Sequence, residues 1–116
     1  MTGHRAERVA ESVRAVIADL LLREIKDPRV GMVTLTAVHL TDDLRHCKVY
    51  FSCVGDDEGH ARALTGLRSA AGFIRRQLTR RLQLRYAPEV TFEFDPSLEI
   101  SDRLSALLRG VRPSDE

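Results

Sequence analysis

The chain has 116 residues, of which 43% are hydrophobic and 30% are charged, and its formal net charge is +1. These values are ordinary for a folded domain with a single hydrophobic core. The sequence excludes a membrane-spanning helix, because no apolar run approaches the roughly 20 residues that such a helix needs. The polar first residues lack the apolar segment of a signal peptide, so we expect a cytoplasmic protein.

The first predicted helix extends from about Arg5 to Lys26. Its apolar residues recur at intervals of three and four, which places them along one face. We expect this helix to end at Asp27-Pro28, because the residue before a proline is driven out of the helical region. The apolar face consists of Val9, Val13, Ile17, Leu20, Leu21 and Ile25.

Two strands are predicted next, over residues 32–40 and 46–54. Both contain alternating apolar residues, and the five turn-forming residues between them indicate an antiparallel hairpin with one buried face. Cys47 and Cys53 lie six residues apart on the second strand. That spacing corresponds to about 20 Å, which is too long for a disulfide, so we expect two reduced core thiols.

The segment 60–88 is the most unusual part of the sequence, because it contains seven arginines and no acidic residue. Its apolar residues have helical spacing and predict a helix from about His60 to Leu84. Phe73 falls opposite these residues on a straight helix, and Gly72 weakens a helix by about 1 kcal/mol. We therefore expect two helices joined by a kink near Gly72.

A third strand is predicted over residues 90–95, with alternating apolar residues, and it ends at Pro96-Ser97. A short last helix is expected around residues 100–108, and residues 110–116 are expected to be disordered. The sequence thus predicts one domain over residues 1–109. The order helix, strand, strand, kinked helix pair, strand and short helix predicts a two-layer α+β fold with the helices on one face of the sheet.

Five short motifs, found in order along nearly the whole chain, resemble the bacterial ribosome-binding factor A family. They are residues 24–31 (EIKDPRVG), 41–44 (TDDL), 69–75 (SAAGFIR), 84–89 (LRYAPE) and 92–98 (FEFDPSL). The resemblance implies a type II KH-like fold in which an Ala-x-Gly kink, here Ala70-Ala71-Gly72, replaces the phosphate-clamping Gly-x-x-Gly loop of other KH domains. Two features depart from the family pattern: Pro96 replaces an acidic or polar residue of many relatives, and the long basic tail of some members is absent.

The resemblance also implies a function. Members of this family bind the free small ribosomal subunit, contact its RNA and assist late maturation, including processing of the 5′ end of the small-subunit RNA, and they are tied to growth in the cold. We accordingly expect a monomer that needs no cofactor and no small-molecule substrate.

The arginine-rich segment favours RNA binding on its own account, because arginine donates two parallel hydrogen bonds to a phosphate. Arg62, Arg76 and Arg80 project away from the apolar face, while Arg68 and Arg75 bracket the kink. The predicted RNA-binding residues are Arg62, Arg68, Ser69, Ala70, Gly72, Arg75, Arg76, Arg80 and Arg81. Secondary candidates are Arg29, Arg45, Lys48 and Arg85.

Structural roles compete with several of these assignments. Arg81 and Arg85 are alternatively partners of acids in the third strand or the last helix, and the small residues 70–72 alternatively allow tight packing against the sheet. Tyr50 and Phe73 are the aromatic residues considered for stacking on bases, although a core position is the better interpretation of Phe73.

No pattern indicates catalysis. The histidines are scattered, no Cys or His spacing suggests zinc, and neither a phosphate loop nor a nucleophile elbow is present. Asp95, Glu99 and Asp102 are the acids that would have to gather for a divalent ion, an interpretation that we discount. The alternatives to a non-enzymatic ribosome assembly factor are a basic module that docks an acidic protein, a general binder of single-stranded nucleic acid and, more distantly, a nuclease.

Overall fold

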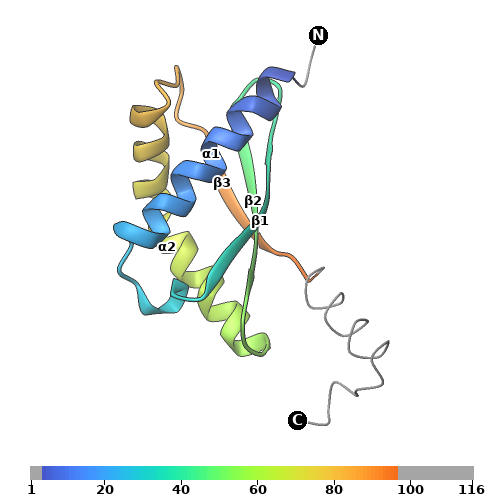
Figure 1. Ribbon diagram of the computed structural model, residues 1–116, viewed down its shortest axis with the longest axis vertical. Helices are drawn as coiled ribbons and strands as arrows, with labels where there is room; N and C mark the ends of the chain where they lie inside the picture. Colours follow the sequence, from blue (N-terminus) through green and yellow to red (C-terminus); the bar gives the residue numbers. More distant parts are fainter. Residues whose placement is uncertain (1–3, 97–116) are drawn as a thin grey trace.

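The computed structural model describes residues 4–96, which form a three-stranded sheet with two helices packed on one of its faces (Figure 1). The elements are α1 (His4–Arg23), a short 3-10 helix η1 (Pro28–Val30), β1 (Val33–Leu40), β2 (His46–Cys53), α2 (Asp57–Arg81) and β3 (Glu89–Phe94). The predicted two-layer α+β fold is confirmed. Among these residues, no helix has the length and apolar character to cross a membrane. The predicted last helix and the predicted tail lie outside the described residues.

The sheet has the order β1-β2-β3, so β2 is its central strand. β1 pairs with β2 in the antiparallel direction, which confirms the predicted hairpin. β3 pairs with β2 in the parallel direction. Because parallel neighbours need a long crossover connection, the chain must cross the face of the sheet between these strands, and α2 is that crossover.

A β-bulge in β1 keeps its apolar residues on one face. Strict alternation from Leu35 would turn Val38 and Leu40 toward solvent. The register shifts by one residue at Thr36, however, so that Leu35 lies opposite Phe51 and the later apolar residues return to the helix side. Leu35 and Leu40 are both buried. The sequence pattern predicts the strand but not this bulge.

The hydrophobic core lies between the sheet and the two helices. Its fully buried side chains are Val13, Ile17 and Leu20 of α1, Leu67, Ile74 and Leu78 of α2, and Val49 and Phe51 of β2. Each such side chain contributes about 1.5–3 kcal/mol by leaving water. Cys47 and Cys53 are free thiols, as predicted, and burial raises the pKa of Cys47 to about 11.

Both helices begin or end about three residues from their predicted limits. α1 ends at Arg23 rather than Lys26, since the carbonyl oxygen of Leu20 accepts hydrogen bonds from the backbone of both Glu24 and Ile25 and closes the last turn. α2 begins at Asp57 because the side chain of Asp56 accepts a hydrogen bond from the backbone of Gly59, which is an N-cap contact.

The expected change of direction within segment 60–84 is present, but the expected division into two helices was wrong. α2 is a single uninterrupted helix of 25 residues, and its two halves run in different directions (Figure 1). Buried residues on both sides of Gly72, such as Leu67 and Ile74, belong to the same core. Their packing outweighs the roughly 1 kcal/mol by which one glycine weakens a helix, so α2 bends without breaking. Phe73 is partly buried against this core, as expected.

Candidate nucleic-acid interface

The side of α2 that faces away from the core carries a stripe of arginines and small residues, which we call the outer stripe. It consists of Arg62, Arg68, Ser69, Gly72, Arg76 and Arg80, all exposed. Across residues 4–96, none of its arginines forms an ion pair. The guanidinium groups of the outer stripe therefore keep their hydrogen-bond donors for another molecule.

Gly72 leaves open space beside the helix rather than packing against the sheet. A side-chain carbon built at Gly72 would lie 3.5 Å from Nη1 of Arg76, which is an ordinary contact. The packing role considered for this segment falls instead to Ala70 and Ala71, which are partly buried against the core. Gly72 exposes its backbone beside a guanidinium, an arrangement that lets a phosphate approach closely.

The glycine that serves close packing is Gly66, which the sequence analysis missed. A side-chain carbon there would lie 2.9 Å from Cγ1 of Val30 and 3.0 Å from Cβ of Arg29. Gly66 is buried, and its missing side chain lets α2 approach η1. The available signal was its position beside Leu67 within the apolar face of the helix.

Arg75 of α2 is hydrogen-bonded within the protein. Nε of Arg75 donates to the carbonyl oxygen of Pro88 at 2.8 Å, and Nη2 donates to that of Ala87 at 3.4 Å. Arg75 thus fastens the connection between α2 and β3. These two hydrogen bonds occupy the guanidinium N–H donors that Arg75 would otherwise offer to a phosphate.

Arg81 ties the end of α2 to α1. Its Nη1 lies 2.9 Å from Oδ2 of Asp19, and its Nη2 lies 2.9 Å from Oε2 of Glu24. Arg81 therefore does pair with acids, but on α1 and just after it rather than on the elements proposed from the sequence. Its hydrogen bond is the largest cause that holds the pKa of Asp19 below its usual value, with a further contribution from Arg23.

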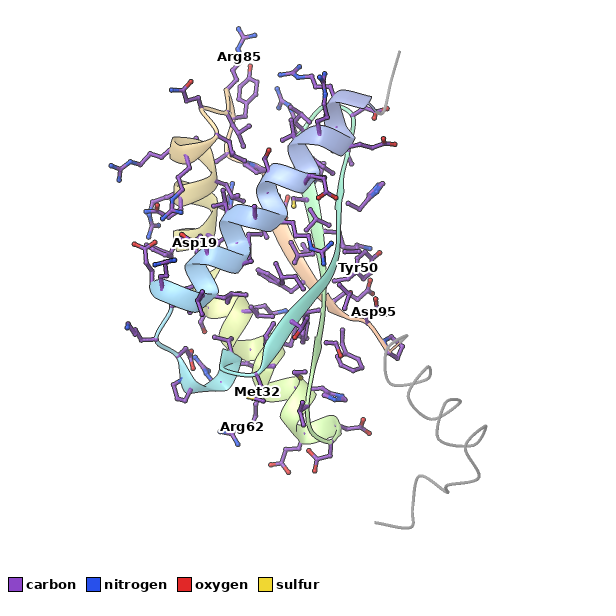
Figure 2. The ribbon with its side chains drawn as sticks, in the orientation of Figure 1. Asp19, Met32, Tyr50, Arg62, Arg85 and Asp95 are labelled. Carbon is purple, nitrogen blue, oxygen red and sulfur yellow. The ribbon has the colours of Figure 1, made fainter. Side chains whose placement is uncertain are left out.

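Two secondary candidates are also engaged. Nε and Nη2 of Arg29 bind the carboxylate of Asp27 at 3.0 and 2.6 Å, which lowers the pKa of Asp27 and raises that of Arg29. Nζ of Lys48 lies 3.8 Å from Oε2 of Glu93 on the open face of the sheet. Tyr50 and Asp95 lie on that same face, away from the helices (Figure 2).

The other two secondary candidates meet at one aromatic ring. The guanidinium of Arg45 lies 4.2 Å from the ring centre of Tyr86, and that of Arg85 lies 5.9 Å from it. Neither arginine forms an ion pair with a described residue. Arg85 and Arg62 lie at opposite ends of the described part of the chain (Figure 2), with the other arginines of the outer stripe on α2 between them in sequence.

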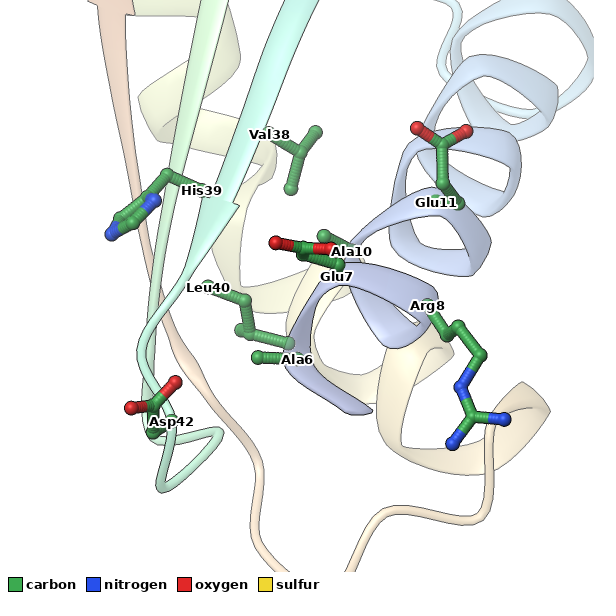
Figure 3. Close-up of a pocket in the computed structure, with 9 residues that line it drawn as sticks. All are labelled: Ala6, Glu7, Arg8, Ala10, Glu11, Val38, His39, Leu40 and Asp42. Atoms are coloured by element: carbon green, nitrogen blue, oxygen red, sulfur yellow. The ribbon is translucent and has the colours of Figure 1, made fainter. Parts of the chain in front are cut away.

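A groove of about 560 Å³ lies between the start of α1 and the end of β1 (Figure 3). Its charged lining is mainly acidic, with Glu7, Glu11 and Asp42 against Arg8. Such a lining repels a polyanion, which leaves α2 as the better candidate surface. Within residues 4–96, no three His, Cys, Asp or Glu side chains gather to hold a metal ion.

Comparison with known proteins gives a consistent result. The profile of a protein family described as Ribosome-binding factor A matches residues 5–108. A Ribosome-binding factor A of Natranaerobius thermophilus is 47% identical over 116 residues, which cover all of this chain and 88% of that protein.

A crystal structure and a model fitted into a cryo-EM map extend the likeness to the fold. A crystal structure of ribosome-binding factor A from Thermus thermophilus matches with a TM-score of 0.66 and 26% identity, over 76% of this chain and 93% of that one. A homology model of Thermus thermophilus ribosome binding factor A, fitted into a cryo-EM map of a complex with the 30S particle, matches with a TM-score of 0.58 and 26% identity, over 81% of this chain and 94% of that one.

Proposed function

Since this chain belongs to the ribosome-binding factor A family, we propose that it binds the free small ribosomal subunit and its RNA, and that it assists late maturation of that subunit, including processing of the RNA 5′ end. The family is one of binding factors rather than enzymes. Its fold is the KH-like α+β fold of its structural neighbours. We also propose that the protein acts as a monomer in the cytoplasm and supports growth in the cold.

The observation that carries this proposal is the outer stripe of α2. Its arginines are exposed and unpaired among the described residues, and Gly72 leaves space beside Arg76. Unpaired guanidinium groups neutralise phosphates and release counterions, which supplies affinity that falls with salt. Phosphate contacts place a protein without reading sequence, so selectivity for the small subunit comes from the shape of its folded RNA.

The test is cosedimentation of the purified protein with separated small subunits, large subunits and joined ribosomes at two salt concentrations. We expect selective binding to free small subunits, weaker at the higher salt. Equal binding to all particles would point to a nonspecific basic domain. Binding to none of them, together with capture of a protein from nuclease-treated extract, would favour an acidic protein partner.

A further inference from the structure

A second surface feature lies at the end of the molecule where Arg85 projects (Figure 2). It is a pocket of about 340 Å³ formed by three segments: the start of α1, the turn between β1 and β2, and the connection from α2 to β3. Its lining consists of Arg5, Val9, Asp43, Leu44, Leu82, Gln83, Leu84, Arg85 and Tyr86. The volume is at the lower end of the range of about 300–1,000 Å³ that is typical of small-ligand sites.

One part of the pocket lining is apolar and aromatic. Tyr86 is 51% exposed, which makes it one of the few large hydrophobic residues left in solvent. The aliphatic lining residues are Val9, Leu44, Leu82 and Leu84, all only partly buried. A flat aromatic ring beside aliphatic side chains is the kind of surface on which an unstacked nucleobase is stable in water.

The rim of the pocket is positively charged. Arg5, Arg45 and Arg85 lie at or beside it, and none forms an ion pair within residues 4–96. The acid in the lining is Asp43, whose carboxylate already accepts hydrogen bonds from Oγ1 of Thr41 at 2.7 Å and from the backbone of Arg45 at 3.0 Å. These hydrogen bonds favour the ionised carboxylate of Asp43, but Arg5, Arg45 and Arg85 outnumber it, so the rim keeps an excess of positive charge that suits a phosphate.

The pocket is also held in place by unusual backbone. Leu44 and Gln83 are the two non-glycine residues of the described chain with positive φ, at 62° and 51°, and both line this pocket. The conformation of Gln83 is maintained by the end of α2, where the backbone of Leu84 donates to the carbonyl oxygen of Thr79 at 3.1 Å. Because the walls are formed before any ligand binds, little ordering entropy opposes binding.

We propose that this pocket binds one unpaired nucleotide of the RNA, with its base stacked on the part of the Tyr86 ring that the Arg45 guanidinium leaves exposed and its phosphate neutralised by Arg5 and Arg85. The inference rests on the proposed function for the nature of the partner, and it adds a contact that the outer stripe does not provide. The other tyrosine is a natural control. Tyr50 lies on the open face of the sheet, where the neighbouring Lys48 is paired with Glu93.

A direct test is NMR titration of the full chain with a short single-stranded RNA of alternating adenosine and cytidine. We expect the ring signals of Tyr86 and the methyl signals of Leu44 and Leu84 to shift, since a stacked base imposes a ring current on them. The ring signals of Tyr50 are the internal reference. Shifts confined to α2, without any change at Tyr86, would overturn the proposal.

A second test uses small subunits and the variants Tyr86→Leu and Tyr86→Phe, with Tyr50→Leu as the matched control. Loss of one stacked base is expected to weaken binding by roughly tenfold in Tyr86→Leu. The salt dependence is expected to stay unchanged, because no phosphate contact is lost. Tyr86→Phe and Tyr50→Leu are expected to bind like the wild type.

The outcomes separate this inference from the proposed function. If Tyr86→Leu binds like the wild type while reversal of outer-stripe charges weakens binding, the pocket proposal is wrong and the proposed function stands. If the wild type does not bind small subunits but the free RNA shifts the Tyr86 signals, the pocket stands and the proposed function fails. Absence of both effects would reject both.

Discussion

The arginines of α2 fall into two groups that differ in their partners rather than in their chemistry. Arg76 and Arg80 of the outer stripe have no ion-pair partner among the described residues. Arg75 and Arg81, each next to one of them in sequence, are bound to backbone carbonyls and to the acids Asp19 and Glu24. A count of positive charges therefore overstates the extent of a binding surface, because some of the arginines stabilise the fold instead.

The same division applies to Gly66 and Gly72 of α2. Gly66 is buried where η1 approaches, and Gly72 is exposed beside Arg76. Each face of the helix therefore has its own glycine and its own arginines. The inward face uses them for packing and fastening, and the outward face leaves them accessible.

Reversing charge on the outer stripe should produce the largest effect. We expect Arg76→Glu combined with Arg80→Glu to weaken binding to small subunits by at least about a hundredfold, since each of the two lost hydrogen bonds to a charged group contributes about 1.5–3 kcal/mol. The free energy of unfolding in urea should fall by no more than about 1 kcal/mol, because both side chains are exposed and only Arg80 lies in the last turn, where the helix dipole favours a positive charge. Binding of the double variant at wild-type affinity would show that the outer stripe is not the interface.

Adding a methyl group to each glycine should have opposite effects on stability. Gly66→Ala brings a carbon within 2.9 Å of Val30, so we expect a loss of about 1–2 kcal/mol in the free energy of unfolding after the gain in helix propensity is subtracted. Gly72→Ala should gain about 0.5–1 kcal/mol, since its new carbon has space. Urea denaturation measures both, and changes of the same sign would contradict the assignment of the two faces.

Removing the fastening arginine should affect stability more than binding. Arg75→Met deletes the hydrogen bonds to Pro88 and Ala87, and we expect the free energy of unfolding to fall by about 1 kcal/mol. Affinity for small subunits, measured well below the unfolding temperature, should change less than about threefold. The reason is that the donors of Arg75 are already bound to the carbonyl oxygens of Pro88 and Ala87. A large loss of affinity with no loss of stability would show that Arg75 contacts RNA as the arginines of the outer stripe do.

The smallest effect concerns acid stability. The pKa of Asp19 is lowered in the folded protein, first by Arg81, so its ionised form stabilises the fold above the ordinary carboxyl pKa, and this contribution is lost as pH falls through the folded value. Asp19→Asn should therefore lower the melting temperature slightly at neutral pH and match the wild type in acid. A difference that grows on acidification would contradict the pairing.

Much of the fold followed from patterns that local sequence carries. Helical spacing in α1 and α2 and the strand patterns of β1, β2 and β3 identified every element of the described chain except η1. The absence of acids in segment 60–88 identified the basic helix. These signals involve residues within a few turns of one another. They are strong because burial of one face is the main source of stability.

The features that sequence could not predict depend on partners distant in the chain. Arg81 lies 57 and 62 residues from its partners, and Arg75 lies 13 residues from Pro88. The bulge at Thr36 and the close approach at Gly66 are likewise properties of two packed elements rather than of one. The unbroken course of α2 had the same origin, because tertiary packing outweighed the weakening by Gly72.

The most direct test of the two groups is the salt dependence of small-subunit affinity for two matched double variants. One removes outer charges, Arg76→Gln with Arg80→Gln, and the other removes fastening charges, Arg75→Gln with Arg81→Gln. We expect the slope of log affinity against log salt to become shallower by about two in the first variant, roughly one for each phosphate contact, and to stay at the wild-type value in the second. Equal slopes in the two variants would contradict the assignment of Arg76 and Arg80 to RNA binding and of Arg75 and Arg81 to stabilising the fold.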